Sequence, residues 1–378
     1  MPRRYPGGMT SALYPADRLA RAAAAARDAG LEALLVTPGA DLRYLTGYDA
    51  LPLERLTCLV VRAAGDATLV VPNLEKPRAE TSPAGALGIE IVGWDETDDP
   101  YALTASIAGP CEAVGVSDRT WALHTLRWAD AMPGVLQRLA GTALRDLRIR
   151  KTPEEVAALR EAGRIIDDVQ GQIQEMRLVG REEREVGRDI ADAILAGGNV
   201  TVNFVIVGSG PNGASPHHDT GPRVIERGDA IVFDIGGTTP DGYCSDITRT
   251  YVVGEVPEGF DKLYAVLQQA QEAACDAVRP GVTCEAVDAA ARDVIADAGY
   301  GEFFVHRTGH GIGLEEHEDP YIVAGNDLPL APGMAFSIEP GIYLPGRHGA
   351  RIEDIVVCTE DGADRLNLVT RDLLVLEG

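Results

Sequence analysis

The chain has 378 residues, 45% of them hydrophobic and 24% charged, a composition typical of a globular protein with room for two domains. No apolar run reaches the ~18 residues of a membrane span, so we expect no membrane segment. The formal net charge of −24 disfavours contact with a phosphate backbone, so we also expect no nucleic-acid partner.

The cysteines and the N-terminal residues bear on the cellular compartment. Six cysteines are scattered without a Cys-x-x-Cys pair, which indicates reduced thiols rather than a disulfide framework. The basic N-terminal stretch, MPRRYPGGMTSALYPADR, lacks the apolar segment of a signal peptide. We therefore expect a cytoplasmic protein.

Residues 15–145 alternate between helix and strand patterns. PADRLARAAAAARDAG predicts a helix with Asp17 as its N-cap and an end at Gly30, and LEALLVT predicts a strand. LTCLVVRAAGDATLVVP holds two apolar runs joined by a Gly-Asp turn, which predicts a hairpin, and IEIVGW and CEAVGVS predict further strands. This order indicates an α/β domain with a mixed sheet, which we place at residues 1–148.

A second domain is expected at residues 152–378. Thr152 is a candidate N-cap and Pro153 suits a first helical position, so a long amphipathic helix should run to about Met176. A second helix pattern covers REEREVGRDIADAILAGG. Strand patterns follow in NVTVNFVIVGSG, DAIVFDIGG and YCSDITRTYVV, then helices at about 258–278 and 284–298, then more strands.

Two hairpins in this second domain carry facing carboxylates. Asp234 and Asp246 are twelve residues apart, and a turn symmetric about Pro240 would place them opposite each other, with Cβ atoms ~5 Å apart. In FSIEPGIYLPGRHGARIEDIVV, a turn centred on Gly346 likewise places Glu339 opposite Glu353. Like charges across a ladder destabilise it, and these strands are otherwise apolar.

Four carboxylates on half-buried strands need protons or cations. The segment HRTGHGIGLEEHEDP adds three histidines within twelve positions. Carboxylates with an imidazole favour Mn, Co, Fe or Zn over metals that prefer thiolates. So many ligands exceed the three of an ordinary catalytic site, so two ions are expected to share them. Acid pairs on exposed strand edges are the alternative interpretation.

The ordered motifs DIGG…YCSDITRT, HRTGHGIGLEEHEDP, FSIEPGIY and RIEDIVV resemble the pita-bread-fold dinuclear metallopeptidases. That family includes Xaa-Pro dipeptidase (prolidase), Xaa-Pro aminopeptidase and methionine aminopeptidase. Residues 15–145, with DLRYLTGY, resemble the N-terminal domain of the Xaa-Pro and creatinase branch, which methionine aminopeptidases generally lack. The resemblance implies a creatinase-like α/β domain at 1–148 and a pita-bread catalytic domain at 152–378.

Matched by motif, the resemblance implies five metal ligands: Asp234, Asp246, His310, Glu339 and Glu353. They would hold two divalent ions, with Mn the expected metal and Co, Zn or Fe the alternatives. Glycines on both sides of the histidine would let backbone crowd close to the cluster. The two aspartates are further apart than is common in the family, which predicts a bulge or a longer loop in the turn and unchanged ligands.

The resemblance also implies catalytic residues outside this ligand set. His317 would hydrogen-bond the substrate carbonyl or its tetrahedral intermediate, and His306 would lie on the substrate side. In SGPNGASPHHDT, His217 matches a further catalytic histidine, with His218 as the alternative. Arg351 would support the site or meet a substrate carboxylate.

The implied activity is hydrolysis of X-Pro bonds in dipeptides or short peptides, with a metal-bridged hydroxide as nucleophile and Glu339 as catalytic proton shuttle. The chain is short for the aminopeptidase branch, so Xaa-Pro dipeptidase is the expected activity. Xaa-Pro aminopeptidase on longer peptides, or a C–N hydrolase of the creatinase type, are the alternatives. The resemblance further implies a homodimer.

Overall fold

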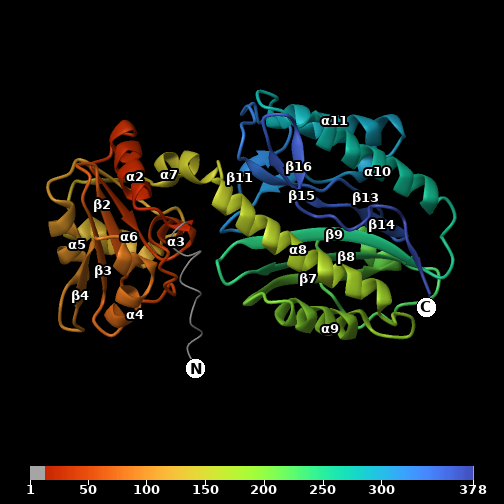
Figure 1. Cartoon of the computed structure of the whole chain (residues 1–378), viewed down its shortest axis with the longest axis horizontal. Helices are drawn as coiled ribbons and strands as arrows, with labels where there is room; N and C mark the ends of the chain where they lie inside the picture. Colours follow the sequence, from red (N-terminus) through yellow and green to blue (C-terminus); the bar gives the residue numbers. More distant parts are fainter. Residues whose placement is uncertain (1–12, 378) are drawn as a thin grey trace. The chain divides into compact units, whose positions relative to one another are not determined.

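The computed structural model describes residues 13–377, and the chain divides into two units, Met1–Arg148 and Ile149–Gly378 (Figure 1). Both units combine helices with β-sheets, which confirms the predicted α/β class. None of the helices between residues 13 and 377 combines the length and the apolar character that a bilayer crossing requires. In the same part of the chain, all six cysteines are free thiols.

The first unit is built on a six-stranded mixed sheet in the order β4-β3-β2-β1-β5-β6. Its strands are β1 (Ala33–Val36), β2 (Cys58–Arg62), β3 (Ala67–Pro72), β4 (Glu90–Trp94), β5 (Ala113–Val116) and β6 (Leu136–Leu139). Its helices are α2 (Asp17–Asp28), α3 (Ala40–Thr46), α4 (Lys76–Thr81), α5 (Pro100–Ala108), α6 (Ala122–Ala131) and α7 (Gly141–Arg148), with the 3₁₀ turn η1 (Pro83–Ala86).

The predicted hairpin of this unit is confirmed by the antiparallel pairing of β2 with β3. The predicted N-cap at Asp17 is wrong, because Ala16 already has helical φ and ψ and Asp17 is the first helical residue. Strand β6 was not predicted from the sequence, because its residues are mostly exposed and form no apolar run.

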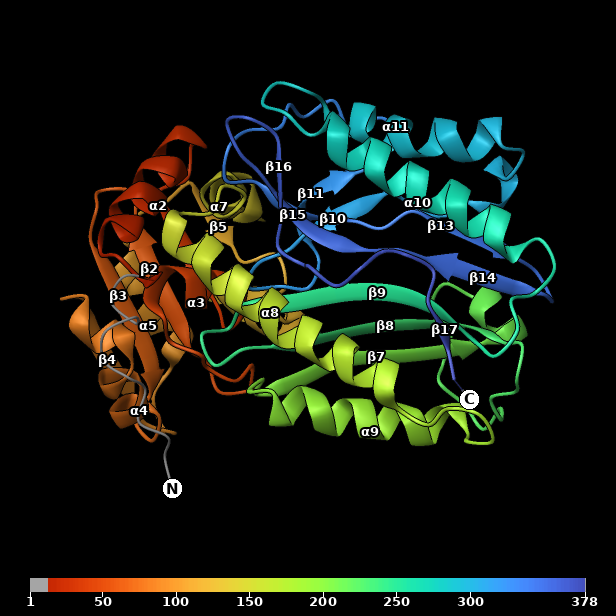
Figure 2. The same cartoon turned by 45° about the vertical axis from the view of Figure 1, so that its right-hand side comes forward.

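In the second unit, one layer is the four-stranded sheet β17-β9-β8-β7, covered by two helices (Figure 2). Helix α8 begins at Pro153, and its capping box, made by Thr152 and Glu155, confirms the predicted start. The elements are α8 (Pro153–Glu175), α9 (Glu183–Ala196), β7 (Thr201–Ser209), η2 (Gly210–Ala214), β8 (Ala230–Thr238), β9 (Cys244–Val253) and β17 (Val375–Leu376).

The other layer is the five-stranded sheet β11-β10-β12-β15-β16 with the hairpin β13-β14, covered by α10 and α11. Its helices are α10 (Phe260–Ala277) and α11 (Cys284–Asp297), both close to their predicted ranges, with η3 (Gly301–Phe303) after them. Its strands are β10 (Gly309–Gly311), β11 (Glu318–Ile322), β12 (Ala335–Ile338), β13 (Gly341–Leu344), β14 (His348–Arg351), β15 (Asp354–Cys358) and β16 (Ala363–Arg365).

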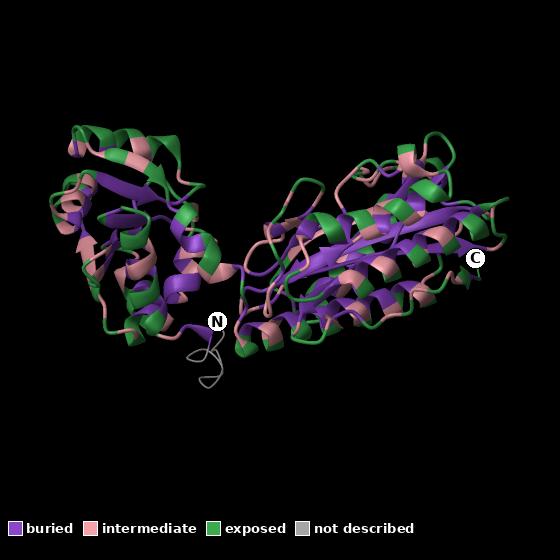
Figure 3. Ribbon diagram, turned by 90° about the horizontal axis from the view of Figure 1, so that it is seen from above, coloured by how far each residue is buried: buried purple, intermediate pink, exposed green. Residues whose placement is uncertain are grey.

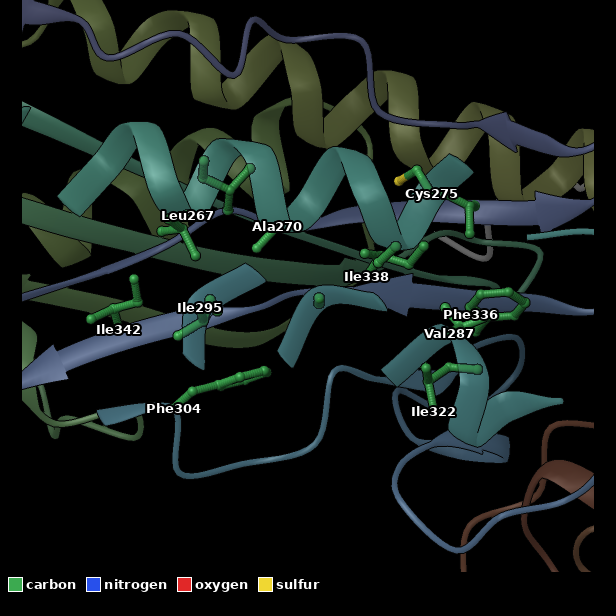
Figure 4. Close-up of a cluster of buried hydrophobic side chains, with 14 of the residues drawn as sticks. Leu267, Ala270, Cys275, Val287, Ile295, Phe304, Ile322, Phe336, Ile338 and Ile342 are labelled. Atoms are coloured by element: carbon green, nitrogen blue, oxygen red, sulfur yellow. The ribbon is translucent and has the colours of Figure 1, made fainter. Parts of the chain in front are cut away.

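Each layer of the second unit has an apolar core between its sheet and its helices. Leu267 of α10 and Val287 of α11 pack in one cluster with Phe336 and Ile338 of β12 (Figure 4). Phe233 of β8 belongs to a separate cluster with residues of α8 and α9. Strands β8 and β9 are buried along almost their whole length (Figure 3), because they are covered on both faces.

Arg249 of β9 joins the two layers. Its guanidinium donates to the Asp354 carboxylate at 2.7 Å and to the carbonyl oxygen of Glu353 at 2.7 Å, and both side chains of the Arg249–Asp354 ion pair are fully buried. It also donates to the carbonyls of Val369 and Thr370. The pair therefore fixes β15 against β9 beside the carboxylates described below.

We predict that Arg249→Met lowers the free energy of unfolding by about 3–5 kcal/mol, because it leaves buried acceptors without their cation. Urea denaturation measures this change. Arg160→Met is the control: Arg160 and Asp364 form an exposed ion pair, with side chains 48% and 40% exposed. It should change stability by less than about 1 kcal/mol. Equal effects of the two substitutions would contradict the prediction.

Candidate metal centre

The two aspartates lie on adjacent strands of the first layer. Asp246 of β9 pairs with Gly236, and Asp234 of β8 pairs with Thr248, so the predicted direct pairing about Pro240 is wrong. The ladder runs to Thr238 without a register shift, so the longer loop, and not a bulge, takes up the extra residue. Since a two-residue offset preserves the strand face, the aspartates are diagonal neighbours on one face.

The two glutamates lie between two ladders of the second layer. Ile338 pairs with Asp354 in one ladder and Gly341 pairs with Arg351 in the next. Both ladders have the register of a hairpin centred on Gly346, which confirms the predicted turn. Glu339 and Glu353 therefore occupy facing positions in that register, as the spacing predicted.

Strand alternation turns these carboxylates away from the helices. Phe233 lies in the core under α8 and α9, so Asp234 faces the opposite side of the sheet. Ile338 lies in the core under α10 and α11, so Glu339 also faces away from its helices. Thr248 joins the layers, because its carbonyl accepts the Glu353 N–H at 3.1 Å and its hydroxyl donates to Glu353 Oε2 at 2.7 Å.

His310 of β10 brings an imidazole to the same place. One ligand atom each of Asp246, His310 and Glu353 lie within 4.8 Å of one another, and all three residues are buried. His310 Nε2 is 3.2 Å from Glu339 Oε1 and 3.7 Å from Asp246 Oδ2. Nδ1 is 3.1 Å from the Gly311 carbonyl, which only accepts. Nδ1 therefore carries a proton, and Nε2 faces the carboxylates.

The glycines beside His310 allow the backbone to approach its neighbours closely. A Cβ at Gly309 would lie 1.8 Å from the Ser337 carbonyl oxygen, and one at Gly311 would lie 2.3 Å from that of Asp319. Ser337 in turn accepts the His310 N–H at 3.0 Å and donates to Glu339 Oε1 at 3.1 Å. A larger residue at either glycine position would move the imidazole.

Three of the carboxylates hold oxygens that lack a hydrogen-bond partner. Among residues 13–377, Asp234 Oδ1, Asp246 Oδ1 and Glu353 Oε1 are buried and unpartnered. Buried polar atoms normally find a partner, and a buried charge needs a counter-charge. Oxygens and an imidazole nitrogen are the donors that Mn, Fe, Co and Zn accept. The residues present therefore fit divalent cations.

The titration of the acids reflects the same crowding. Burial, and then the neighbouring Glu353 and Asp234 carboxylates, raise the pKa of Asp246 well above its usual value. Burial, and then Glu339 and Asp234, raise the pKa of Glu353 in the same way. Burial alone would raise the pKa of Glu339 too, but its hydrogen bond with His310 and nearby positive charges lower it to about 2. The Glu339 carboxylate is therefore ionised at neutral pH.

Arg351 is buried, and its guanidinium hydrogen-bonds to several residues around the site. It donates to the Asp234 carboxylate, to the Tyr343 hydroxyl at 2.6 Å and to the Thr248 hydroxyl at 3.1 Å. Its Nη1 also lies 3.3 Å from the Pro216 carbonyl. Of the two alternatives for this arginine, the contacts favour support of the site.

Tyr343 contacts two of these residues, although no sequence motif pointed to it. Its hydroxyl lies 2.9 Å from His306 Nε2, while His306 Nδ1 lies 2.7 Å from the Arg307 carbonyl and therefore carries the proton. The hydroxyl thus accepts from Arg351 and donates to His306. The two-residue period of a strand could have pointed to Tyr343, because it lies four residues after Glu339 and therefore on the same face.

The remaining histidines differ in exposure and partners. The His317 ring centroid lies 3.9 Å from that of His310, and partial burial, then His310 and Arg307, lower the pKa of His317 to about 4. His217 is exposed and contributes to the lowered pKa values of His306 and His317, so it lies in their neighbourhood. His218 instead contacts the buried Glu183 carboxylate at 2.8 Å.

Comparison with known proteins agrees with this geometry. Residues 157–360 match metallopeptidase family M24, and residues 18–150 match the creatinase/prolidase N-terminal domain. The probable dipeptidase PepE of Mycobacterium tuberculosis is 55% identical over 96% of this chain and 96% of that protein. An Xaa-Pro dipeptidase of Lactobacillus helveticus is 36% identical over 89% and 92%, respectively.

A solved structure extends the likeness to three dimensions. The crystal structure of dipeptidase PepE from Mycobacterium ulcerans superposes with a TM-score of 0.92 at 54% identity, covering 100% of both chains. Sequence matches and structural likeness thus agree over both units, and the second unit has the pita-bread fold. The chain is a member of metallopeptidase family M24 and carries a creatinase/prolidase N-terminal domain.

Proposed function

We propose that this chain is an Xaa-Pro dipeptidase whose cations are held by Asp234, Asp246, His310, Glu339 and Glu353. The observation that carries the proposal is the convergence of these side chains, with buried unpartnered oxygens on three of them. The names of the relatives support dipeptide hydrolysis, and one of them is named for Xaa-Pro dipeptides.

The proposed cofactors are two divalent ions per chain, with Mn preferred and Co, Zn or Fe as alternatives. Such ions, when bound, lower the pKa of a bound water and polarise a carbonyl oxygen. We further propose that the protein is cytoplasmic and acts as a homodimer. Free thiols at all six cysteines support the first of these, and the second follows from the family resemblance.

Glu339 is the proposed proton shuttle. Since its pKa is lowered to about 2, its carboxylate is ionised at neutral pH and can accept a proton from the attacking water. It would then pass that proton to the proline nitrogen as the C–N bond breaks. An X-Pro bond is a tertiary amide without an N–H. Its nitrogen therefore cannot donate a hydrogen bond to a peptide-binding subsite.

His317 is the proposed donor to the scissile carbonyl. The Arg307 guanidinium, which only donates, lies 3.3 Å from His317 Nδ1. Nδ1 of the neutral ring therefore accepts, and the proton is on Nε2. That N–H can stabilise negative charge as it develops on the carbonyl oxygen. His217 is the second proposed donor, because His218 is held by Glu183. Arg351 would position Asp234, and His306 would position Tyr343.

The substrate class is tested with metal-stripped enzyme to which Mn is returned. We predict that kcat/KM for Leu-Pro exceeds that for Leu-Ala and for Leu-Pro-Pro by about 10-fold or more. The stripped enzyme should be inactive before Mn is added. Faster hydrolysis of Leu-Pro-Pro would replace the proposal with Xaa-Pro aminopeptidase, while turnover without any metal would exclude the metal-dependent mechanism.

His317→Ala is predicted to lower kcat by about 10²-fold, since it removes one donor to the developing oxyanion. Bound cation, measured by elemental analysis, should stay at the wild-type level, because this residue is not a proposed ligand. His218→Ala serves as the matched control for histidine loss and should retain much more activity. Wild-type kcat in His317→Ala would end the proposed role.

Cation binding is predicted to stabilise the fold more at high pH. Because the pKa values of Asp246 and Glu353 are raised, their protonated forms stabilise the metal-free fold fully below the ordinary carboxyl pKa, and this contribution is lost as the pH rises through the raised values. Bound cations replace those protons. The Tm increase on adding Mn should therefore be larger at about pH 8 than at about pH 5.5, as thermal unfolding can show.

Glu353→Gln provides the control for this pH dependence, because it removes one raised carboxyl group and one ligand together. Its Tm should respond less to Mn and to pH than that of the wild type. An equal Tm increase at both pH values in the wild-type protein would show that the cation does not displace these protons.

A further inference from the structure

A buried ion pair lies directly beside His317. Lys151 Nζ is 2.6 Å from Glu318 Oε1, and the two side chains are only 2% and 8% exposed. Glu318 follows His317 and is the first residue of β11. Lys151 precedes Thr152, the N-cap of α8, and its N–H donates to the Gly333 carbonyl at 2.7 Å. The pair therefore links the N-terminal end of α8 to strand β11, which begins directly after His317.

His317 itself is exposed, at the end of the loop that leads into β11. Its ring lies against the His310 ring and the Arg307 guanidinium. Such contacts act on the ring, whereas the backbone of His317 is tied to Glu318, which is buried and pairs with Gly311. The anchoring of Glu318 therefore fixes the backbone position from which the His317 side chain extends.

Gly313 makes room for the ion pair. A Cβ at Gly313 would lie 2.6 Å from Glu318 Oε1 and 3.1 Å from Lys151 Cε. The Gly313 carbonyl also accepts the Cys244 N–H at 2.8 Å, two residues before Asp246 in β9. The pair is therefore packed against backbone that is bonded to the strand of a proposed metal ligand.

A buried ion pair is a poor source of net stability, because desolvation of both charges offsets their attraction. The pair does, however, fix the relative position of its two side chains, because neither buried charge can leave its partner. We propose that Lys151 and Glu318 are positioning residues, which fix the backbone of His317 so that its Nε2–H reaches the oxygen of the scissile carbonyl. This inference rests on the proposed function.

The double variant Lys151→Met/Glu318→Gln tests the inference without leaving an unpaired buried charge. Against Leu-Pro with Mn, kcat should fall about 10-fold or more, because a misplacement near 1 Å is sufficient for such a loss. KM and bound Mn should stay near wild-type values. The matched control Arg160→Met/Asp364→Asn removes an exposed pair and should leave kcat unchanged. Unchanged kcat in the first variant would overturn the inference.

A double-mutant cycle separates positioning from general damage. In a His317→Ala background, the same Lys151 and Glu318 substitutions should change kcat by less than about 2-fold, since the group they position is already gone. An equal fall in both backgrounds would show that the pair acts on something other than His317. If the double variant does not fold, Gly313→Ala, whose Cβ would press on both Glu318 and Lys151, replaces it in the cycle with the same expectations.

A measurement without substrate keeps this inference distinct from the proposed activity. In metal-free protein with labelled histidine rings, the His317 resonance is assigned by its loss in His317→Ala. It should shift in the Lys151→Met/Glu318→Gln variant, or in Gly313→Ala, while that of His124 in the first unit stays in place. An unmoved His317 resonance overturns the positioning role. Failure of the wild-type enzyme to cleave Leu-Pro would overturn only the proposed function.

Discussion

The electrostatic cost of burying four carboxylates together is the constraint on which the second unit depends. Asp246 and Glu353 are almost entirely inaccessible, and Asp234 and Glu339 lie beside them. One positive charge, that of Arg351, is held against Asp234. The remaining negative charge must be balanced by protons or by cations. In the metal-free protein, the raised pKa values of Asp246 and Glu353 favour protons, and bound cations would take the unpartnered oxygens as ligands.

The layered fold supplies the rigidity that such a cluster needs. Each sheet has its own helices and its own apolar core, so only the faces turned away from those helices are left for the acids. Thr248 and Arg249 of β9 then bond directly to residues 353 and 354 of the other layer. Because neighbouring residues of one strand make these bonds, the layers have little freedom to shift relative to each other near the site.

Polar residues around the proposed ligands set their orientation. Ser337 bonds both to the His310 backbone and to Glu339. Asp288 of α11 accepts from the backbone and the hydroxyl of Thr308, whose carbonyl accepts the Glu339 N–H. Helix α11 therefore supports the site through hydrogen bonds and does not only cover the sheet.

Features that depend on local geometry could be predicted from the amino-acid sequence alone. The capping box at Thr152, the turn at Gly346 and the shared face of Asp234 and Asp246 follow from short-range rules, chiefly the two-residue period of a strand. The motif order was specific enough to indicate the family, which the matches over both units confirm.

Tertiary structure decided what local rules leave open. The turn after β8 set the pairing of Asp234 with Thr248, and packing held His218 on Glu183. The Arg351–Asp234 pair and the Lys151–Glu318 pair each join residues more than a hundred positions apart. Such contacts are fixed only when two separately built layers come together, because the distance between their side chains depends on the packing of whole sheets and helices rather than on neighbouring residues.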